Sequence, residues 1–448
     1  MVDEKFWLDL PTTGHVDFSE CAAVTAPATM QEYNGRLRLS IFWDQELGNK
    51  IQSWFTHPQY GVEAEGHMFS LPDTLVFHST HGSAILIGCR EDGYQIGGSM
   101  ARGVGHVFFQ RAVEGSARGI DFDKVHELVA TIPGGANWVD LRCPVLDERD
   151  SRDGLTQSVD LDLPLLSSVR LADLNCELRT IWVMTYSHGK FSGESILEVR
   201  SWADVPVSWN THLQKIHKVA ALMELNASRS VPVEIQTILN HDDPGEGRGS
   251  HGEALAVGPR RSAIQAWSSE AEGYARPAVE LVMFEDLGSE GLIRWIRLYE
   301  KYKRALTSLL GMSVWSSGIP AETTLVHAGA GLDALGLAIL RHKDQKSSKS
   351  ADSTPVELKL MRIVDDCLDS LPYSEEVAKD WVRDMSSAYN SLKHSLRVMP
   401  EHEVMVNVNR KCNIIVRAWV AKELGISPEH IKFSLRNDSF YGDVVVLD

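Results

Sequence analysis

One stretch near the C-terminal end of the sequence combines several side chains that can bind phosphate or transfer a proton. It covers residues 381–397 and reads WVRDMSSAYNSLKHSLR. At about 100° per residue, a helix would hold four of its polar side chains within roughly 60° of one another: Arg383, Asn390, His394 and Arg397. Two guanidinium groups, an amide and an imidazole on one face are suited to contact a phosphodiester. The alternative is a solvent-exposed polar face with an ordinary histidine.

The composition is that of a globular protein with more than one domain. A chain of 448 residues exceeds the usual size of one hydrophobic core, so two or three domains are expected. The six cysteines are scattered and form no C-x-x-C pair, which favours reduced thiols and a cytoplasmic location. The first residues lack the basic and apolar regions of a signal peptide, and no apolar run reaches the roughly 18 residues that span a bilayer. We therefore expect no membrane partner.

The net charge of −17 argues against indiscriminate binding of nucleic acids, because most of the surface would repel a phosphate backbone. A protein of this charge that handles RNA needs a local basic site. Apart from the stretch above, one candidate is residues 294–304 (RWIRLYEKYKR), which carry five basic residues and one acid. A solvated helix face explains the same pattern equally well.

The spacing of apolar residues predicts an α+β fold whose first half is rich in strands. Up to about residue 208, short segments alternate apolar and polar residues and are separated by Gly, Pro, Asp and Asn. This pattern predicts an antiparallel β domain that is sandwich-like or barrel-like. Residues 209–226 have helical spacing, and a further strand is predicted at residues 231–239. The clearest earlier strands are residues 36–42, 84–88, 106–112, 181–186 and 196–199.

The last part of the chain, from about residue 286, predicts an all-α bundle. Helices are expected over residues 292–310, 323–341, 356–371, 374–398 and 401–424, with Gly425 as the natural end of the last. Residues 343–353 (KDQKSSKSADS) interrupt the pattern and predict a flexible polar loop.

Other familiar chemistries find little support. The glycine-rich residues 97–105 (GGSMARGVG) lack the Lys-Ser/Thr end of a phosphate-binding P-loop, so a hairpin loop is expected there. His78 and His81 (HSTH) could bind a metal together, but no third ligand is evident from the sequence. We therefore expect no metal site and no cofactor.

The helical half resembles a known family. The segment Tyr389-Asn390-Ser391-Leu392-Lys393-His394 lies in the penultimate long predicted helix, and a bundle with this segment resembles the HEPN ribonucleases. More narrowly, it is similar to the ApeA-type HEPN domain of bacterial anti-phage defence proteins. The β-rich half resembles the N-terminal domain that accompanies that HEPN domain. The resemblance implies a sensing or regulatory domain over residues 1–285 and a ribonuclease domain over residues 286–448.

The family motif is an Arg followed a few residues later by a His, often with Asn directly after the Arg. His394 matches the His and Asn390 matches the Asn, but Tyr389 stands where the Arg is expected. Either Lys393, Arg383 or Arg397 supplies the missing positive charge, or the domain has lost its activity and only binds.

Metal-independent RNA cleavage requires a base for the ribose 2′-hydroxyl, an acid for the leaving 5′-oxygen and positive charge for the phosphate. His394 suits either proton transfer, Asn390 can hold the imidazole or a phosphate oxygen, and Lys393 can stabilise charge. Arg383, Arg397 and Tyr389 are then the candidate RNA contacts. One histidine cannot easily act as base and acid in a single step. The resemblance therefore implies a homodimer, or a larger homo-oligomer, formed through the HEPN domain.

The resemblance also implies a role. A phage-derived trigger would act on the N-terminal domain, and the helical domain would then cut cellular RNA, with tRNA as one candidate substrate, and halt translation. Two alternatives stay open. One is a catalytically decayed HEPN module that binds RNA or protein. The other is a ligand-binding β module joined to a helical oligomerisation domain.

Overall fold

The computed structural model describes most of the chain. The described residues are 8, 10–17, 25–44, 48–55, 70–97, 102–116, 120–139, 145–149, 158–162, 168–187, 190–244, 260–266, 274–310, 319–394 and 396–443. Cys21 and Cys143 and part of the glycine-rich segment at residues 97–105 lie outside them. The four described cysteines are buried, and none forms a disulfide with another described residue.

The first half of the chain is built from strands, as predicted. They are β1 (Thr12–Asp17), β2 (Thr25–Tyr33), β3 (Arg36–Trp43), β4 (Thr74–Ser79), β5 (Gly82–Ile87), β6 (Arg90–Ile96), β7 (Gly103–Phe108), β8 (Arg111–Glu114), β9 (Lys124–Ile132), β10 (Val145–Arg149), β11 (Ser158–Asp162), β12 (Ser168–Leu171), β13 (Cys176–Ser187), β14 (Lys190–Ser208), β15 (Glu234–Leu239) and β16 (Arg260–Gln265). Fourteen of them form one antiparallel sheet in the order β12-β13-β14-β9-β15-β16-β8-β5-β4-β1-β2-β3-β7-β6, and β10 pairs with β11. Among the described residues, three α-helices lie between the strands: α1 (Gly48–Phe55), α2 (Ala136–Val139) and α3 (Trp209–Ala227).

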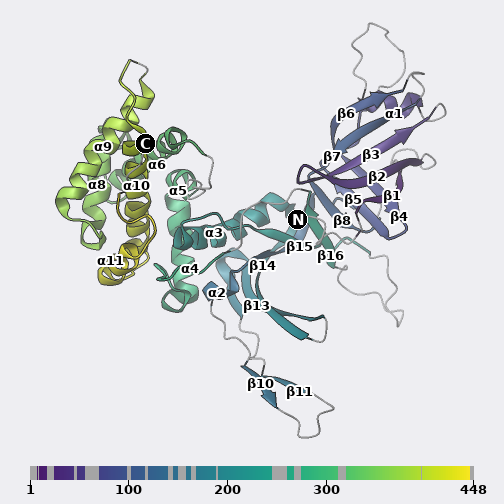
Figure 1. Cartoon of the computed structure of the whole chain (residues 1–448), viewed down its shortest axis with the longest axis horizontal. Coiled ribbons are helices and arrows are strands. Elements are labelled where there is room, and N and C mark those ends of the chain that lie inside the picture. The colour runs from purple at the N-terminus through teal and green to yellow at the C-terminus, as the bar shows by residue number, and fades with distance from the viewer. Residues whose placement is uncertain are drawn as a thin grey trace. The chain divides into compact units, whose positions relative to one another are not determined.

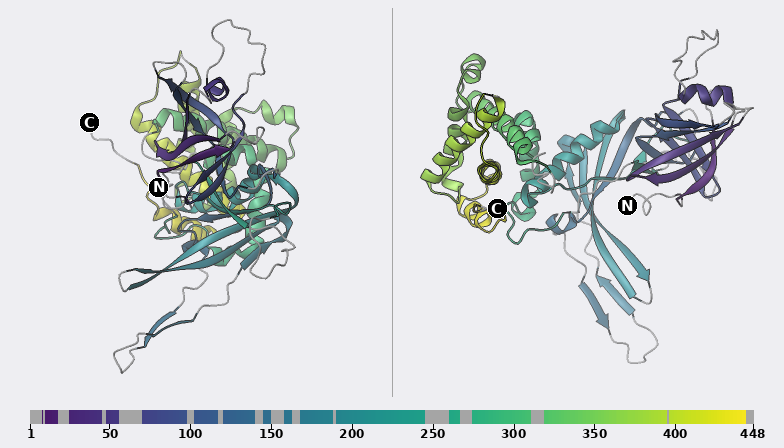
Figure 2. Two further views of the ribbon diagram at one scale, coloured as in Figure 1. Left: turned by 90° about the vertical axis from the view of Figure 1, so that its right-hand side faces the viewer. Right: turned by 45° about the horizontal axis from the view of Figure 1, so that its top comes forward.

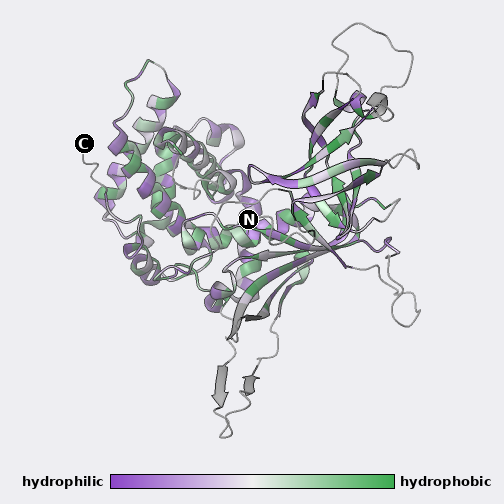
Figure 3. Ribbon diagram, turned by 45° about the vertical axis from the view of Figure 1, so that its right-hand side comes forward, coloured by the Kyte–Doolittle hydropathy of each residue, from purple (hydrophilic) through white to green (hydrophobic). Residues whose placement is uncertain are grey.

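The helical part follows from α4 onward, which confirms the predicted α+β class (Figure 1). Its helices are α4 (Phe284–Lys301), α5 (Lys303–Leu310), α6 (Ala321–His342), α7 (Ser348–Asp352), α8 (Val356–Cys367), α9 (Glu375–Lys393), α10 (His402–Glu423) and α11 (Pro428–Arg436). In Figure 3, green hydrophobic and purple hydrophilic residues alternate along these helices, as they do in amphipathic helices.

The chain divides into two compact units. Unit 1 comprises residues 1–131, 199–215 and 234–270, and unit 2 comprises residues 132–198, 216–233 and 271–448. The domain boundary expected between residues 285 and 286 stays a prediction.

In unit 1 the sheet curls around its own apolar core. Alternate side chains of β3, those of Leu37, Leu39 and Ile41, are fully buried, as period-two alternation predicts. The Leu37 N–H donates to the Ala266 carbonyl, 2.7 Å away, and thereby joins the start of β3 to the residue that follows β16. The right-hand view of Figure 2 shows these strands, in purple and blue, wrapped around a common centre. This closure of the sheet gives unit 1 the barrel-like character that was predicted.

Several predicted element boundaries were wrong. Residues 106–112 are not one strand, because the chain turns at Phe109 and Gln110 between β7 and β8. Residues 292–310 are not one helix, because α4 ends at Lys301 and α5 begins at Lys303. Gly425 ends α10 as predicted, and its positive φ of +89° is the left-handed conformation that glycine adopts most easily.

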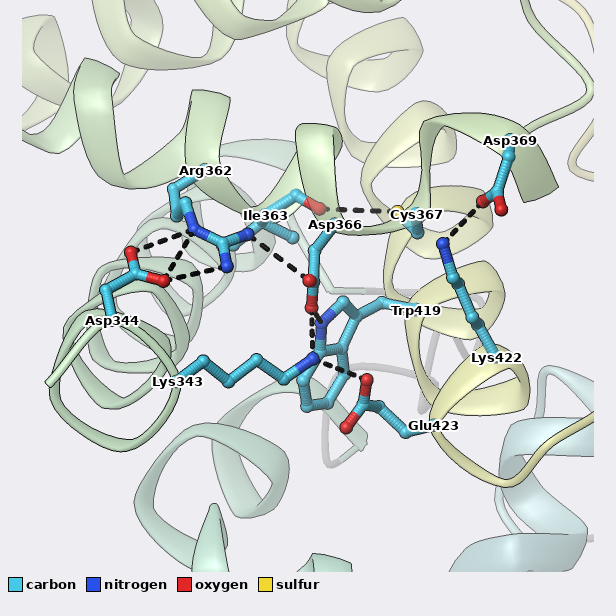
Figure 4. A network of polar contacts seen from close by, with 10 residues as sticks. All are labelled: Lys343, Asp344, Arg362, Ile363, Asp366, Cys367, Asp369, Trp419, Lys422 and Glu423. Carbon is cyan, nitrogen blue, oxygen red and sulfur yellow. Dashed lines mark hydrogen bonds and ion pairs between the residues drawn. The ribbon is translucent and has the colours of Figure 1, made fainter.

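The polar segment at residues 343–353 is more ordered than the predicted flexible loop. It contains α7, whose N-cap Ser347 accepts a hydrogen bond from the Ser350 N–H. At its start, the Lys343 ammonium lies 2.5 Å from both Asp366 and Glu423, so this residue ties α6 to α8 and α10 (Figure 4). The Lys- and Ser-rich composition of this segment predicted a loop. It could not show that Lys343 has carboxylate partners on two other helices.

One helix, α6, is long and apolar enough to cross a membrane by length and composition alone. About half of its apolar window is buried within the protein, including Leu325, Leu332, Leu335 and Ile339. A core helix of a bundle meets the same criterion, so the finding is weak evidence for a membrane span.

A partly buried carboxyl on α3 gives unit 2 an expected pH dependence. Burial raises the pKa of Glu224 from 4.5 to about 7, against the opposing effect of its hydrogen bonds from the Val231 N–H and Ser230. The folded state therefore holds a proton that the unfolded state releases between these two values. We expect stability to fall as pH rises through this window, by at most about 3 kcal/mol.

Glu224→Gln keeps both hydrogen-bond acceptor roles and removes the titration. The free energy of unfolding in urea should fall less from pH 5 to pH 8 for this variant than for the wild type. Glu290→Gln, at an exposed position of α4, is the control and should leave the loss unchanged. Equal pH dependence in Glu224→Gln and wild type would contradict the assignment.

Candidate nucleic-acid site on helix α9

Helix α9 is specified by its N-terminus and by one apolar face. Its N-cap Ser374 accepts a hydrogen bond from the Val377 N–H at 3.3 Å, and two glutamates occupy the first turn, where the helix dipole favours negative charge. The apolar face is buried in the bundle, and the Trp381 indole N–H donates to the Val408 carbonyl on α10 at 3.0 Å. The opposite face of α9, which carries Arg383, is left to solvent.

The helix ends earlier than predicted. Its last residue is Lys393, and His394 at the C-cap has extended backbone angles of φ −122° and ψ 104°. The Arg397 N–H then donates to the His394 carbonyl at 2.9 Å in a turn. The prediction of a helix to residue 398 was therefore wrong, and His394 and Arg397 do not continue the helical stripe of Arg383 and Asn390.

The predicted site residues are distributed between the end of α9 and the turn that follows it. Arg383 is exposed and forms an ion pair with Asp380 one turn earlier. Asn390 is half-buried, and His394 and Arg397 are exposed. Within the described part of the chain, the side chains of these last three residues make no hydrogen bond or ion pair. They are therefore available to a ligand.

Tyr389, the residue at the expected Arg position, faces the bundle. It is 6% exposed, and its ring packs against Gly329 of α6. The Lys393 ammonium lies 4.8 Å from the centroid of the same ring, within the range of a cation–π contact. Tyr389 thus packs the end of α9 against α6, and Lys393 places a positive charge on its ring.

This packing leads to a prediction at Gly329. A Cβ added there would lie 2.1 Å from Cδ2 of Tyr389, a distance that real Cβ atoms do not show. Gly329→Ala should therefore displace the ring and destabilise unit 2 by about 1–3 kcal/mol, as overpacked cores do.

A double-mutant cycle tests this cause. Gly329→Ala should lower the free energy of unfolding much less in a Tyr389→Leu background than in the wild type. Urea unfolding of the wild type, the two single variants and the double variant measures this difference. Additive effects would show that the two side chains do not compete for the same space.

The second basic candidate, residues 294–304, is partly occupied by structural roles. Arg294 donates to the Leu424 carbonyl at 2.7 Å and so caps the end of α10. Glu300 pairs with Lys218 of α3. Lys303 and Arg304 are exposed at the start of α5.

Exposed apolar side chains, which the sequence pattern did not single out, begin two positions after His394. Leu396 is 100% exposed, Val398 is 90% exposed and Met399 is 54% exposed. Three large apolar side chains so close together on the surface of a turn are a common sign of a protein contact. Leu396 and Val398 fall within the helix predicted over residues 374–398, which hid their position on the surface after α9.

A comparison with protein families finds a match in the β-rich part of the chain. Residues 60–269 match the family model described as ApeA N-terminal domain 1. This segment is similar to ApeA N-terminal domains. No curated protein and no solved structure matches the chain.

The ApeA N-terminal domain match covers the strands from β4 to β16 and helix α3. It ends before α4, so it does not include α9 or any of the predicted site residues. The resemblance of the helical region to HEPN domains stays a prediction that rests on its own residues.

Proposed function

We propose that this chain is an anti-phage defence protein whose helical region cuts RNA without a metal ion and so stops translation in an infected cell. The observation that carries the proposal is the match of residues 60–269 to the ApeA N-terminal domain model, followed in the same chain by a helical bundle. The exposed imidazole of His394, at the end of α9 and close in sequence to Asn390, supports a nuclease role for that bundle.

In this proposal His394 takes the proton of the ribose 2′-hydroxyl or gives one to the leaving oxygen. Lys393 and Arg397, which flank it in the sequence and are also exposed, hold the phosphate. Asn390 orients the imidazole or a phosphate oxygen. Arg383 contacts the RNA further along α9, after release from its ion pair with Asp380. The products carry a 2′,3′-cyclic phosphate and a 5′-hydroxyl.

A homodimer through the helical region would supply a second histidine for the other proton transfer. The exposed side chains of Leu396, Val398 and Met399 support this arrangement, because they lie two to five positions after His394 and would be covered by a partner. The trigger is proposed to be phage-derived and to act on the ApeA N-terminal domain, and the protein is proposed to work in the cytoplasm without a cofactor.

One observation favours a second candidate, a catalytically inactive module that binds RNA or protein. Tyr389 replaces the motif Arg and is buried against Gly329, so it cannot bind phosphate without repacking the bundle. In this case the exposed residues after His394 serve recognition only.

Infection of cells that express each variant separates the two candidates. Wild type should protect against at least one member of a phage panel, and RNA from those infected cells should carry new cyclic-phosphate ends. Cells with His394→Ala should contain the same amount of protein but show neither protection nor these ends. Protection that persists in His394→Ala without new ends would favour the binding module and contradict the nuclease.

A further inference from the structure

A cluster on the sheet of unit 1 has the donor atoms of a metal site. It consists of His15 and Asp17 on β1 and His78 on β4, and one ligand atom of each lies within 4.8 Å of the others. The two strands are antiparallel neighbours in which His15 pairs with His78. Because alternate residues of a strand point to the same face, Asp17 lies on the face of His15. We propose that these three side chains bind one divalent transition-metal ion, with Zn²⁺ as the best match.

A fourth residue holds the His78 ring in the orientation that metal binding requires. Nδ1 of His78 lies 2.8 Å from Oγ of Ser83, which is opposite His78 on β5. The other ring nitrogen, Nε2, faces Asp17, with Oδ2 at 3.1 Å. Metal-bound imidazoles usually donate a hydrogen bond through their second nitrogen, which fixes the tautomer. With the ion bound, Nδ1–H of His78 would donate to Ser83 and Nε2 would bind the metal.

The geometry needs only a side-chain adjustment to accept the ion. Zinc binds nitrogen and oxygen at about 2.0–2.2 Å, so tetrahedral ligands lie roughly 3.3–3.6 Å apart. Asp17 is already 3.9 Å from Nε2 of His15 and 3.1 Å from Nε2 of His78. The two imidazoles are stacked with centroids 5.1 Å apart, and the His15 side chain is 50% exposed and can turn toward the ion.

The donor set selects the class of ion. Two imidazole nitrogens and one carboxylate suit Zn²⁺, Ni²⁺ or Cu²⁺, whereas Mg²⁺ and Ca²⁺ prefer oxygen ligands throughout. Three protein ligands leave a fourth position for water. The ion would join β1 to β4 and, through Ser83, to the β4–β5 hairpin. This inference does not rest on the proposed nuclease function, since its residues all belong to unit 1.

From the sequence alone, His78 has His81 as its nearest candidate co-ligand. His81 follows it after two residues and is exposed at the turn between β4 and β5, whereas the contacting histidine is His15, on a strand distant in sequence. This difference provides a matched control.

The test uses the purified full chain, stripped of metal with a chelator and titrated with Co²⁺ as a spectroscopic stand-in for Zn²⁺. We expect visible absorption that saturates at one Co²⁺ per chain and is bleached by Zn²⁺. His15→Ala and Asp17→Asn should abolish the saturable absorption, and Ser83→Ala should weaken Co²⁺ binding by about 10-fold or more. His81→Ala should bind Co²⁺ as the wild type does.

Thermal unfolding of the metal-free variants establishes that each is folded. His15 is half exposed and Asp17→Asn keeps the shape of the side chain, so at least one of the two should match the metal-free wild type. The proposal is overturned if wild type shows no saturable absorption, or if a folded His15→Ala or Asp17→Asn protein retains it. In that case the cluster is a hydrogen-bonded contact between strands and nothing more.

Discussion

His394→Ala should lower the rate of RNA cleavage by the activated protein at least about 100-fold, which is the usual contribution of a general acid or base. His394 is the one imidazole in the predicted motif, and its side chain is exposed at the end of α9. Because this side chain is exposed, its loss should leave folding intact. The assay measures cyclic-phosphate ends on total bacterial RNA in the presence of EDTA, with DNA as a substrate that lacks the 2′-hydroxyl. A lysate of phage-infected cells supplies the trigger.

The matched control is His402→Ala. His402 is also exposed, lies eight positions further along the chain and begins α10. The His402→Ala protein should cleave RNA at the wild-type rate. Lys393→Gln and Arg397→Gln should each slow cleavage less than His394→Ala, since each removes one of several nearby positive charges. Equal rates for His394→Ala and wild type would contradict catalysis by His394.

Arg417→Met should destabilise unit 2 by about 3–5 kcal/mol, because it removes one partner of a buried ion pair. The Arg417 side chain on α10 is 3% exposed and lies 2.6 Å from Asp438. A second guanidinium nitrogen donates to the Asn226 carbonyl at the end of α3, at 3.0 Å. Methionine replaces the aliphatic part of the side chain but leaves the Asp438 carboxylate and the Asn226 carbonyl without their donor.

The control lies on the same helix. Lys422 pairs with Asp369 at 2.6 Å, but the two side chains are 34% and 56% exposed. Lys422→Met should therefore cost no more than about 1 kcal/mol. Urea unfolding followed by far-UV circular dichroism compares the variants, and a similar loss for both would refute the special role of the buried pair. Asp438→Leu added to Arg417→Met should recover part of the stability, since no unpaired charge then stays buried.

The fold class was predictable because it depends on local periodicity. The alternating burial of Leu37, Leu39 and Ile41 and the apolar face of α9 are both readable from the spacing of residues. The N-terminus of α9 was also readable, from Ser374 followed by two glutamates. Its C-terminus was not, because residues 391–399 contain neither Gly nor Pro and nothing local marks a stop at Lys393.

The site was predictable only in part, because only its helical residues follow from local periodicity. Arg383 and Asn390 share the helical geometry that their spacing indicates, whereas His394 and Arg397 lie beyond the helix. The burial of Tyr389 depends on a glycine of α6 sixty positions earlier, which no pattern within α9 reveals. The trio of His15, Asp17 and His78 likewise depends on the pairing of β1 with β4. Contacts of this kind arise from tertiary structure and leave no periodic trace in the sequence.

The hydrogen bonds made by residues 216–233 and 271–283 determine which fragments of this protein can be produced for biochemical work. A fragment that begins at α4 would discard the Lys218 carbonyl that accepts from the Trp295 indole and the Asn226 carbonyl that accepts from Arg417. It would also lose the Glu280 carbonyl, a partner of His430 on α11 at 2.8 Å. Such a fragment should express poorly and be sensitive to protease. A hybrid gene that transplants the bundle therefore has to carry α3 and the segment before α4 with it.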